Sequence, residues 1–214
     1  MAREFDEVAL RFQAKAELRA RLKGVRRALP AEARRERSLR VATRVSSLDA
    51  WANARTILAY VAMAGETDPA PLVESLLGAG RVLVLPRIEP GDLDLKLKRV
   101  DGDGADGHAT VAAQLEDSGY GFAQPPTTAA DVDPADVDMV LVPAMAVDER
   151  GHRLGYGRGY YDRLLPRLPH AVRVVIAYDF QLLSELPNTP GDERVDYVVT
   201  DARILDTGRR GEGP

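Results

Sequence analysis

The chain has 214 residues, 45% hydrophobic and 29% charged, a composition typical of a globular protein with a substantial core. A formal net charge of -4 argues against a dedicated nucleic-acid binder, and the lack of cysteine excludes disulfides and thiolate metal sites. No apolar run approaches the roughly 20 residues of a membrane span, and the N-terminus lacks a signal-peptide core. We therefore expect a cytoplasmic protein that binds neither nucleic acid nor membrane.

Residues 8–29 predict an amphipathic helix that ends before Pro30, because leucine and valine recur there at helical spacing. The segment also carries a basic stripe at helical offsets, formed by Lys15, Arg19, Lys23 and Arg26. We interpret Lys23 and Arg26 as part of a solvated face, since surface charges need no partner. Further helices are predicted over residues 31–48 and 49–54.

Unbroken apolar runs predict buried strands over residues 56–63, 81–85, 139–143, 172–178 and 195–199. Helices are predicted over residues 69–77 and from Tyr160 onward, and residues 93–98 alternate as an edge strand does. This order predicts an α/β fold, a single Rossmann-like domain over residues 1–206 with a largely parallel twisted sheet flanked by helices on both faces. We expect residues 101–108 to form a solvated loop and residues 207–214 a disordered tail.

A loop before the helix at Tyr160 alternates glycine with other residues: Gly155, Tyr156, Gly157, Arg158 and Gly159. Glycine N–H groups that lead into a helix N-terminus favour an anion, and Arg153 and Arg158 add donors that match phosphate oxygens. Asp162 would repel phosphate unless a divalent cation lay between them, so the residues predict a nucleotide with Mg²⁺. The glycine spacing matches neither the P-loop nor the dinucleotide fingerprint, and a plain flexible turn is the alternative.

Glu66 follows the predicted strand over residues 56–63, at the end of a strand where open α/β sheets bind their ligands. The alternative is a carboxylate that stabilises the N-terminus of the following helix. Position alone leaves both interpretations open.

The run Arg-Leu-Gly-Tyr-Gly-Arg-Gly-Tyr-Tyr-Asp-Arg at residues 153–163 resembles the signature of the 5-formyltetrahydrofolate cyclo-ligases, also called 5,10-methenyltetrahydrofolate synthetases. Separate matches extend this resemblance over most of the chain: Lys-Ala-Glu-Leu-Arg at 15–19, Gly-Glu-Thr-Asp at 65–68 and Gly-Asp-Glu-Arg-Val-Asp at 191–196. The implied reaction is ATP- and Mg²⁺-dependent closure of 5-formyltetrahydrofolate to 5,10-methenyltetrahydrofolate, with release of ADP and phosphate.

The resemblance also implies a set of site residues. Those expected around ATP are Lys15, Arg19, Arg153, Leu154, Gly155, Tyr156, Gly157, Arg158, Gly159, Tyr160 and Tyr161. Those expected at the folate are Val61, Glu66, Tyr156, Gly157, Arg158, Gly159 and Tyr160. Asp162 and Asp192 match the Mg²⁺ carboxylates, and we expect Arg158 and Tyr160 to be catalytic.

Some positions depart from the family pattern. Residues 144–147 replace the usual Gly-Leu-x-Phe, Arg158 stands where lysine is more common, and Gly191 replaces a frequent histidine. These departures bear on affinity and rate more than on reaction type. The alternatives are a related α/β enzyme that phosphorylates a different small substrate and a non-catalytic nucleic-acid module using the basic stripe. We expect a monomer.

Overall fold

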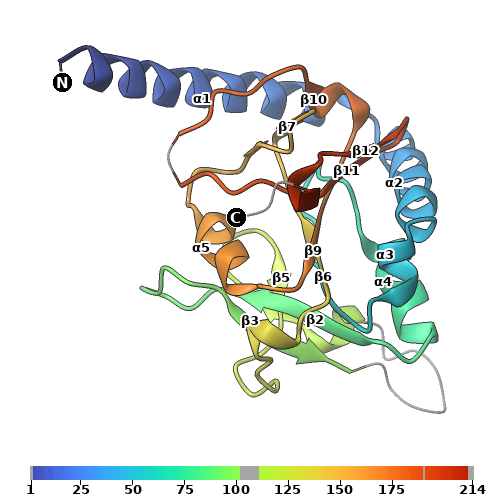
Figure 1. Ribbon diagram of the computed structural model, residues 1–214. Coiled ribbons are helices and arrows are strands. Elements are labelled where there is room, and N and C mark those ends of the chain that lie inside the picture. Colours follow the sequence, from blue (N-terminus) through green and yellow to red (C-terminus); the bar gives the residue numbers. More distant parts are fainter. Residues whose placement is uncertain (1, 102–110, 190, 212–214) are drawn as a thin grey trace.

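The computed structural model describes residues 2–101, 111–189 and 191–211, so nearly all of the loop predicted over 101–108 lies outside the described residues. Figure 1 shows a twisted sheet with helices on both sides. This main sheet has seven strands in the order β12-β11-β9-β6-β1-β2-β3. Their bounds are β1 (Thr56–Leu58), β2 (Val82–Arg87), β3 (Lys96–Val100), β6 (Met139–Val142), β9 (Val172–Ala177), β11 (Tyr197–Thr200) and β12 (Ile204–Asp206).

The five central strands are parallel, and only the two edge strands of this sheet, β3 and β12, run antiparallel to their neighbours. In the register, Ile57 of β1 lies opposite Leu83 of β2 on one side and Met139 of β6 on the other. The chain winds outward from β1 in one direction through β2 and in the other through β6, β9 and β11. The predicted α/β class is therefore confirmed, and β1 and β6 flank its topological switch point.

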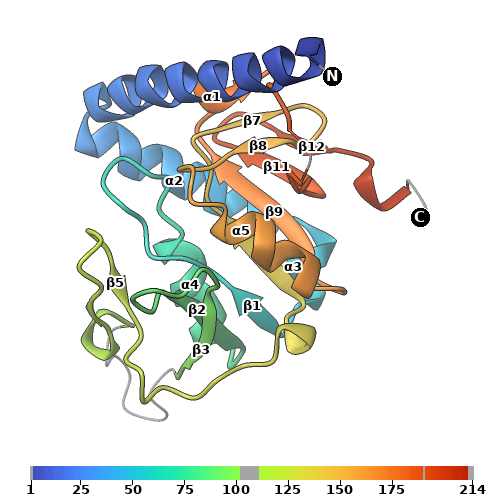
Figure 2. The same ribbon diagram turned by 90° about the vertical axis from the view of Figure 1, so that its left-hand side faces the viewer.

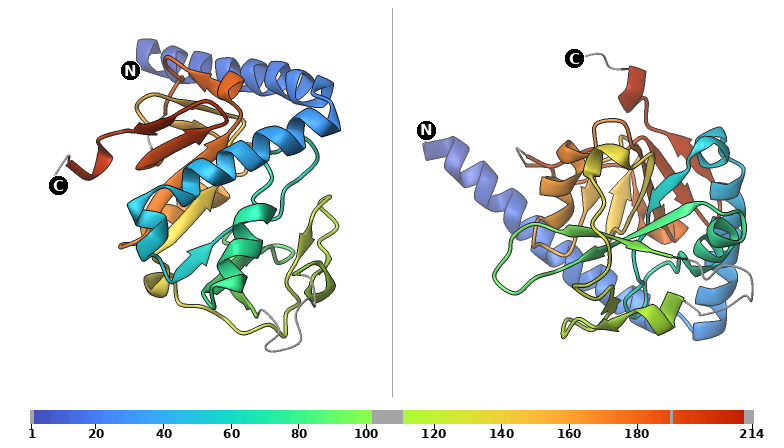
Figure 3. Two further views of the ribbon diagram at one scale, coloured as in Figure 1. Left: turned by 90° about the vertical axis from the view of Figure 1, so that its right-hand side faces the viewer. Right: turned by 90° about the horizontal axis from the view of Figure 1, so that it is seen from below.

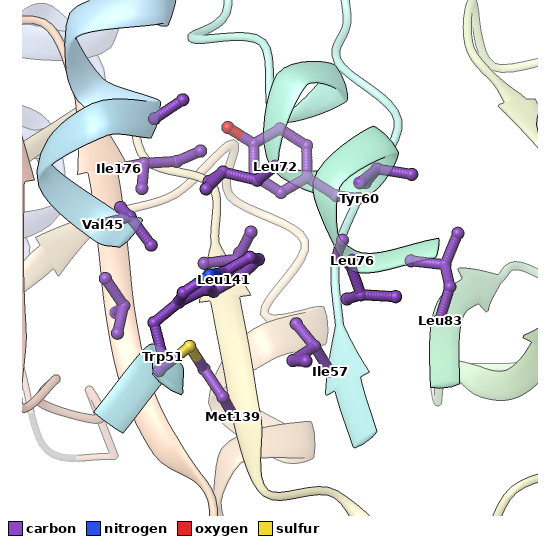
Figure 4. Packing of buried hydrophobic residues seen from close by; sticks show 14 of the residues in the cluster. Val45, Trp51, Ile57, Tyr60, Leu72, Leu76, Leu83, Met139, Leu141 and Ile176 are labelled. Carbon is purple, nitrogen blue, oxygen red and sulfur yellow. The ribbon is translucent and has the colours of Figure 1, made fainter. Parts of the chain in front are cut away.

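Successive residues of the central strands point to opposite faces, and helices cover both. One face packs against α2 (Ala31–Ser46), α3 (Asp49–Asn53) and α4 (Ala70–Gly78), and Figure 4 shows Trp51 and Leu76 against Ile57, Met139 and Leu141. The left view of Figure 3 shows α2 running across that face. The other face packs against α5 (Tyr160–Leu164) and η3 (Leu165–Arg167), through side chains including Leu58, Val140, Leu164 and Leu165.

The first helix, α1 (Ala2–Ala28), starts earlier than predicted and lies along a second, small sheet, as Figure 2 shows. That sheet joins β10 (Leu182–Leu183), β7 (Ala146–Asp148) and β8 (Arg153–Leu154). Leu22 of α1 is buried there against Met145, Ala146, Leu154 and Leu186. The sequence did not predict this sheet, because its strands are only two or three residues long.

The remaining elements are short. They are η1 (Val111–Gln114), β4 (Glu116–Asp117), β5 (Ala123–Gln124), η2 (Pro134–Asp136), η4 (Asp179–Gln181) and η5 (Arg209–Gly211). Strands β4 and β5 pair as a hairpin. Among the described residues, no helix is both long enough and apolar enough to cross a membrane.

The C-terminal segment differs from the disordered tail that we expected. Thr207 donates through its hydroxyl to the Val195 carbonyl at 2.6 Å, and Arg209 pairs with the buried Asp196 at 2.7 Å. Residues 207–211 are therefore held against the end of β11, whereas residues 212–214 lie outside the described part of the chain.

Candidate active site

A cavity of about 550 Å³ opens at the carboxyl ends of the central strands. Residues that follow β1 and β6 line it, including Tyr60, Val61 and Pro143. Because these two strands flank the switch point, the loops after them diverge and leave a crevice, where open α/β folds bind ligands. The volume is in the range of small-molecule sites.

The cavity brings together every site residue expected from the sequence. These are Lys15, Arg19, Val61, Glu66, Arg153, Leu154, Gly155, Tyr156, Gly157, Arg158, Gly159, Tyr160, Tyr161, Asp162 and Asp192. They come from α1, the loop after β1, the segment from β8 to α5, and the loop before β11. Residues that lie more than 170 positions apart in the sequence thus share one site, while their ligands remain a prediction.

Helix α1 directs two of its cations to one end of the cavity. Lys15 Nζ lies 2.5 Å from Asp192 Oδ2 and 2.8 Å from Thr189 Oγ1. Arg19 Nε donates to the Gly155 carbonyl at 2.8 Å. The Arg19 contact docks α1 onto the glycine loop and places positive charge beside that loop's backbone, while Lys15 joins α1 to the loop before β11.

The glycine loop has left-handed backbone at two of its three glycines, Gly157 with φ 96° and Gly159 with φ 68°. A Cβ on Gly157 would lie 3.6 Å from the Arg19 guanidinium carbon, and one on Gly159 would lie 2.9 Å from Arg163 Nη1. The left-handed backbone therefore favours glycine at both positions, and at Gly159 an added Cβ would also require the end of the Arg163 side chain to move. Helix α5, which follows, has five residues, so its dipole contributes less to an anion site than the sequence suggested.

Arg153 is a buried cation at the same end. Its Nη2 donates to Asp162 Oδ1 at 2.8 Å, and its guanidinium lies 5.7 Å from the centre of the Tyr161 ring. Burial lowers the pKa of Arg153, while Asp162 opposes that shift. Within the described residues, Arg153 Nε and the Tyr161 hydroxyl are buried without a hydrogen-bond partner. Buried polar atoms are normally paired, so these two favour a polar ligand.

The two candidate metal carboxylates line this end as well. Asp192 Oδ2 accepts from Lys15 and, at 2.6 Å, from the Thr189 backbone N–H. Burial opposes ionisation of Asp192, but these hydrogen bonds outweigh it and lower its pKa. Within the described residues, no group of three or more Asp, Glu, His or Cys side chains is placed to hold a metal. A cation here would need further oxygen ligands from another molecule.

Farther along α1, beside Arg26, the cavity wall contains one buried acid, Glu66. Its Oε1 accepts from the Tyr156 hydroxyl at 2.5 Å, and its Oε2 accepts from the Met63 backbone N–H at 2.7 Å. Burial raises the pKa of Glu66, while hydrogen bonds from Tyr156 and Met63 and the charge of Arg26 oppose the shift. Apolar side chains complete the lining of the cavity as a whole: Phe12, Val61, Met63, Ile88, Leu95 and Phe122.

Sequence reasoning assigned Arg26 incorrectly. We interpreted it as solvated, but its side chain is 4% exposed, whereas Lys23 is exposed as expected. Arg26 lies seven residues after Arg19, two helical turns along the same face of α1, and this spacing was the available signal. Tyr60 was also missed: it lines the cavity, and its hydroxyl donates to the Thr67 carbonyl at 2.7 Å.

Comparison with known proteins gives concordant matches. The model of the 5-formyltetrahydrofolate cyclo-ligase family matches residues 11–201. A curated 5-formyltetrahydrofolate cyclo-ligase from Mycolicibacterium smegmatis is 31% identical over 193 residues, covering 89% of this chain and 95% of that protein. The cyclo-ligase of Escherichia coli strain K12 is 31% identical over 182 residues, covering 84% and 96%.

Solved structures agree with this fold. The NMR structure of Aquifex aeolicus 5,10-methenyltetrahydrofolate synthetase has a TM-score of 0.76 and 33% identity, covering 90% of this chain and 92% of that one. A 5,10-methenyltetrahydrofolate synthetase from Mycoplasma pneumoniae has a TM-score of 0.67 over 87% of this chain. At 22% identity, that second likeness supports the fold alone.

Proposed function

The chain belongs to the 5-formyltetrahydrofolate cyclo-ligase family, and on that premise we propose that it uses ATP and Mg²⁺ to close 5-formyltetrahydrofolate to 5,10-methenyltetrahydrofolate. ADP and phosphate are the other products. The observation that supports this proposal is the composition of one cavity, whose lining combines four cations and three glycines with apolar side chains and one buried acid, Glu66.

The cationic end suits a triphosphate. Four cations line it, namely Lys15, Arg19, Arg153 and Arg158, and three glycines lie beside them. The absent Cβ atoms let a ligand approach the backbone N–H groups closely, and each arginine offers a planar fork to phosphate oxygens. The unpaired Arg153 Nε and Tyr161 hydroxyl add two donors that a ligand would satisfy. Leu154, Tyr156, Tyr160 and Tyr161 complete the proposed ATP contacts.

The residues also fit Mg²⁺ bound together with a nucleotide. Mg²⁺ uses one or two protein carboxylates and takes its other oxygens from phosphates and water. Asp162 and Asp192 would supply those carboxylates, and both are held in place by cations, Arg153 and Lys15. When bound, the metal would neutralise charge on the phosphates. The same pairs hold the two carboxylates beside the proposed phosphate contacts.

The apolar lining and the buried Glu66 suit a folate. The ring system offers flat apolar faces and N–H donors, which match Val61 and the carboxylate of Glu66. Tyr156 and Tyr160 line the same cavity, together with Gly157 and Gly159, and Tyr156 contacts Glu66 directly. A substrate bound in this way would direct its formyl group toward the phosphate end.

The chemistry explains why both ligands must share a site. The N5-formyl group is an amide, so its carbon is a poor electrophile and its oxygen a poor leaving group. Transfer of the γ-phosphoryl to that oxygen makes the carbon electrophilic. N10 then forms the new C–N bond and releases its proton to solvent, and phosphate departs with the oxygen. Such transfer depends on positioning and charge stabilisation rather than on a protein nucleophile. Arg158 is the proposed cation at the transferred group, and Tyr160 the proposed neighbour of the formyl group.

The basic stripe of α1 supports this function over nucleic-acid binding. Lys15 and Arg26 are buried against Asp192 and Tyr156, so they are turned toward the cavity rather than toward an external phosphate backbone. The overall negative charge of the chain also argues against nucleic-acid binding.

The test is an absorbance assay for methenyltetrahydrofolate formation from 5-formyltetrahydrofolate. We expect product only when ATP and Mg²⁺ are both present. Product without ATP would contradict the proposed energy source. A folded protein that binds ATP yet forms no product would favour the alternative of a related enzyme with a different acceptor.

A further inference from the structure

Arg26 joins three parts of the protein at the folate end of the cavity. Its Nε donates to the Gly65 carbonyl at 2.8 Å, and its Nη1 donates to the Tyr156 hydroxyl at 2.7 Å and also contacts Met145 Sδ at 2.8 Å. Its Nη2 lies 3.9 Å from Glu66 Oε1. One buried side chain thus links α1 to the loop after β1 and to the glycine loop.

The chain packs closely around this residue. Gly65 has φ 86°, and a Cβ there would lie 3.6 Å from the Arg26 carbonyl oxygen, so the two backbones pass near each other. A guanidinium reaches partners in several directions from one planar group, whereas an ammonium is a single point charge. The site therefore suits arginine specifically.

The direction of the hydrogen bonds is fixed. Arginine only donates, so the Tyr156 hydroxyl accepts from Arg26 and must give its own proton to Glu66. Met63 N–H occupies a position on the other Glu66 oxygen. A carboxylate has about four acceptor positions, which leaves about two for a ligand. Arg26 thus determines which positions on Glu66 remain available.

The charge of Arg26 acts on the same carboxylate. Burial raises the pKa of Glu66, and Arg26 is the cation that opposes this shift. The other ionisable groups around Glu66 are the hydroxyls of Tyr60, Tyr156 and Tyr161, whose own pKa values are raised, first by burial and then by Glu66. Those hydroxyls stay neutral at ordinary pH, so the charge balance of this end lies between Glu66 and Arg26.

We propose that Arg26 is a positioning residue for substrate binding: it orients the Tyr156 hydroxyl and keeps Glu66 ionised, with two acceptor positions directed at the N–H donors of the substrate. The identity of that substrate rests on the proposed function. Arg26 acts through Tyr156 and Glu66 and belongs to the folate end, while Lys15 and Arg19 on the same helix belong to the phosphate end.

The test compares Arg26→Gln and Arg26→Lys with the unaltered protein, measuring kcat and KM for each substrate against pH. For Arg26→Gln we expect KM for 5-formyltetrahydrofolate to rise tenfold or more and the acid limb of kcat/KM to move to higher pH. KM for ATP should stay within twofold. Lysine supplies the charge without the planar fork. In Arg26→Lys the acid limb of kcat/KM should therefore lie at the same pH as in the unaltered protein, whereas KM for 5-formyltetrahydrofolate should remain partly raised.

Two control variants distinguish the proposed effect of Arg26 on Tyr156 and Glu66 from a general loosening of α1. Arg27→Gln changes the exposed neighbour and should match the unaltered protein. Leu22→Ala loosens the packing of α1 against Met145 but keeps the Arg26 guanidinium and its partners Gly65 and Tyr156, and it should lower the melting temperature while leaving the acid limb in place. The proposal is overturned if Arg26→Gln keeps the unaltered folate KM and acid limb, or if Leu22→Ala reproduces its shift.

A measurement without turnover keeps this test independent of the proposed function. The Glu66 carboxyl carbon can be titrated by ¹³C NMR, with Glu66→Gln identifying its signal. We expect a higher pKa in Arg26→Gln than in the unaltered protein, and an equal pKa would overturn the role of Arg26. An unaltered protein that forms no methenyl product would instead contradict the proposed function.

Discussion

The cations of the phosphate end differ in how they are held. Lys15 and Arg153 are buried and paired with Asp192 and Asp162, so their positions are fixed before any ligand arrives. Arg158 is exposed and lies 5.7 Å from the centre of the Tyr120 ring. A solvated side chain of this kind moves at small cost, so Arg158 is the cation best suited to follow a phosphoryl group during transfer.

Arg158→Ala is expected to reduce kcat by about 10² to 10³, the effect of removing one donor that stabilises transition-state charge. Steady-state kinetics measures the change. Arg167→Ala, which removes an arginine outside the cavity, serves as the matched control and should retain activity. Turnover of Arg158→Ala close to that of the control would remove Arg158 from the chemistry.

Asp192→Asn is expected to raise the Mg²⁺ concentration needed for half-maximal turnover, because a neutral amide is a weaker metal ligand than a carboxylate. The substitution keeps the size of the side chain and leaves its carbonyl able to accept from the Thr189 N–H. A Mg²⁺ titration at saturating ATP provides the measurement. An unchanged midpoint would exclude Asp192 as a metal ligand.

Glu66 should make stability depend on pH in a characteristic direction. Its pKa in the folded protein is raised mainly by burial, so the folded state binds a proton that the unfolded chain releases at lower pH. Stability attributable to Glu66 is therefore present below its unfolded pKa and is lost as pH rises through the folded value.

Urea unfolding of the unaltered protein and Glu66→Gln at several pH values tests this. Relative to the variant, which cannot titrate at this position, the unaltered protein should gain unfolding free energy as pH falls from neutral toward the normal glutamate range. A difference between the two proteins that is constant with pH would contradict the raised pKa.

At the scale of elements, the sequence pattern predicted strands that show a local apolar pattern. It did not predict the burial of side chains whose partners lie far away in the sequence. The apolar runs at β6 and β9 were recognised because both faces of those strands are covered. The alternation over 93–98 indicated inward leucines and outward lysines, yet Leu93 is 70% exposed and Lys98 is buried. Lys98 donates to the carbonyls of Thr127 and Ala129, partners thirty residues away that no local pattern reveals.

The C-terminal segment gives a test at this scale. Deleting residues 207–214 removes Arg209 from the buried Asp196 and Thr207 from the Val195 carbonyl. Losing partners of a buried charge should reduce the free energy of unfolding by about 1 to 3 kcal/mol. The control is a chain that lacks only residues 212–214 and therefore keeps Arg209 and Thr207. Equal urea midpoints for the two truncations would show that residues 207–211 contribute nothing.

At the scale of the whole molecule, the fold explains why the site residues meet. Because β1 and β6 are parallel, the loops that follow them lie at the same edge of the sheet. Helix α1 forms one side of the cavity and contributes Lys15 and Arg19 to its lining. Sequence reasoning reached this arrangement through strand order and the family resemblance. It did not reach the small β10-β7-β8 sheet that supports α1, because three short strands carry too little pattern to recognise.

We propose that the cavity holds ATP and the folate together so that phosphate leaves with the formyl oxygen. The most direct test uses 5-formyltetrahydrofolate labelled with ¹⁸O in the formyl group, followed by mass spectrometry of the released phosphate. Each phosphate formed alongside methenyltetrahydrofolate should carry one ¹⁸O atom. Unlabelled phosphate, formed at the same rate as the product, would contradict transfer to the formyl oxygen.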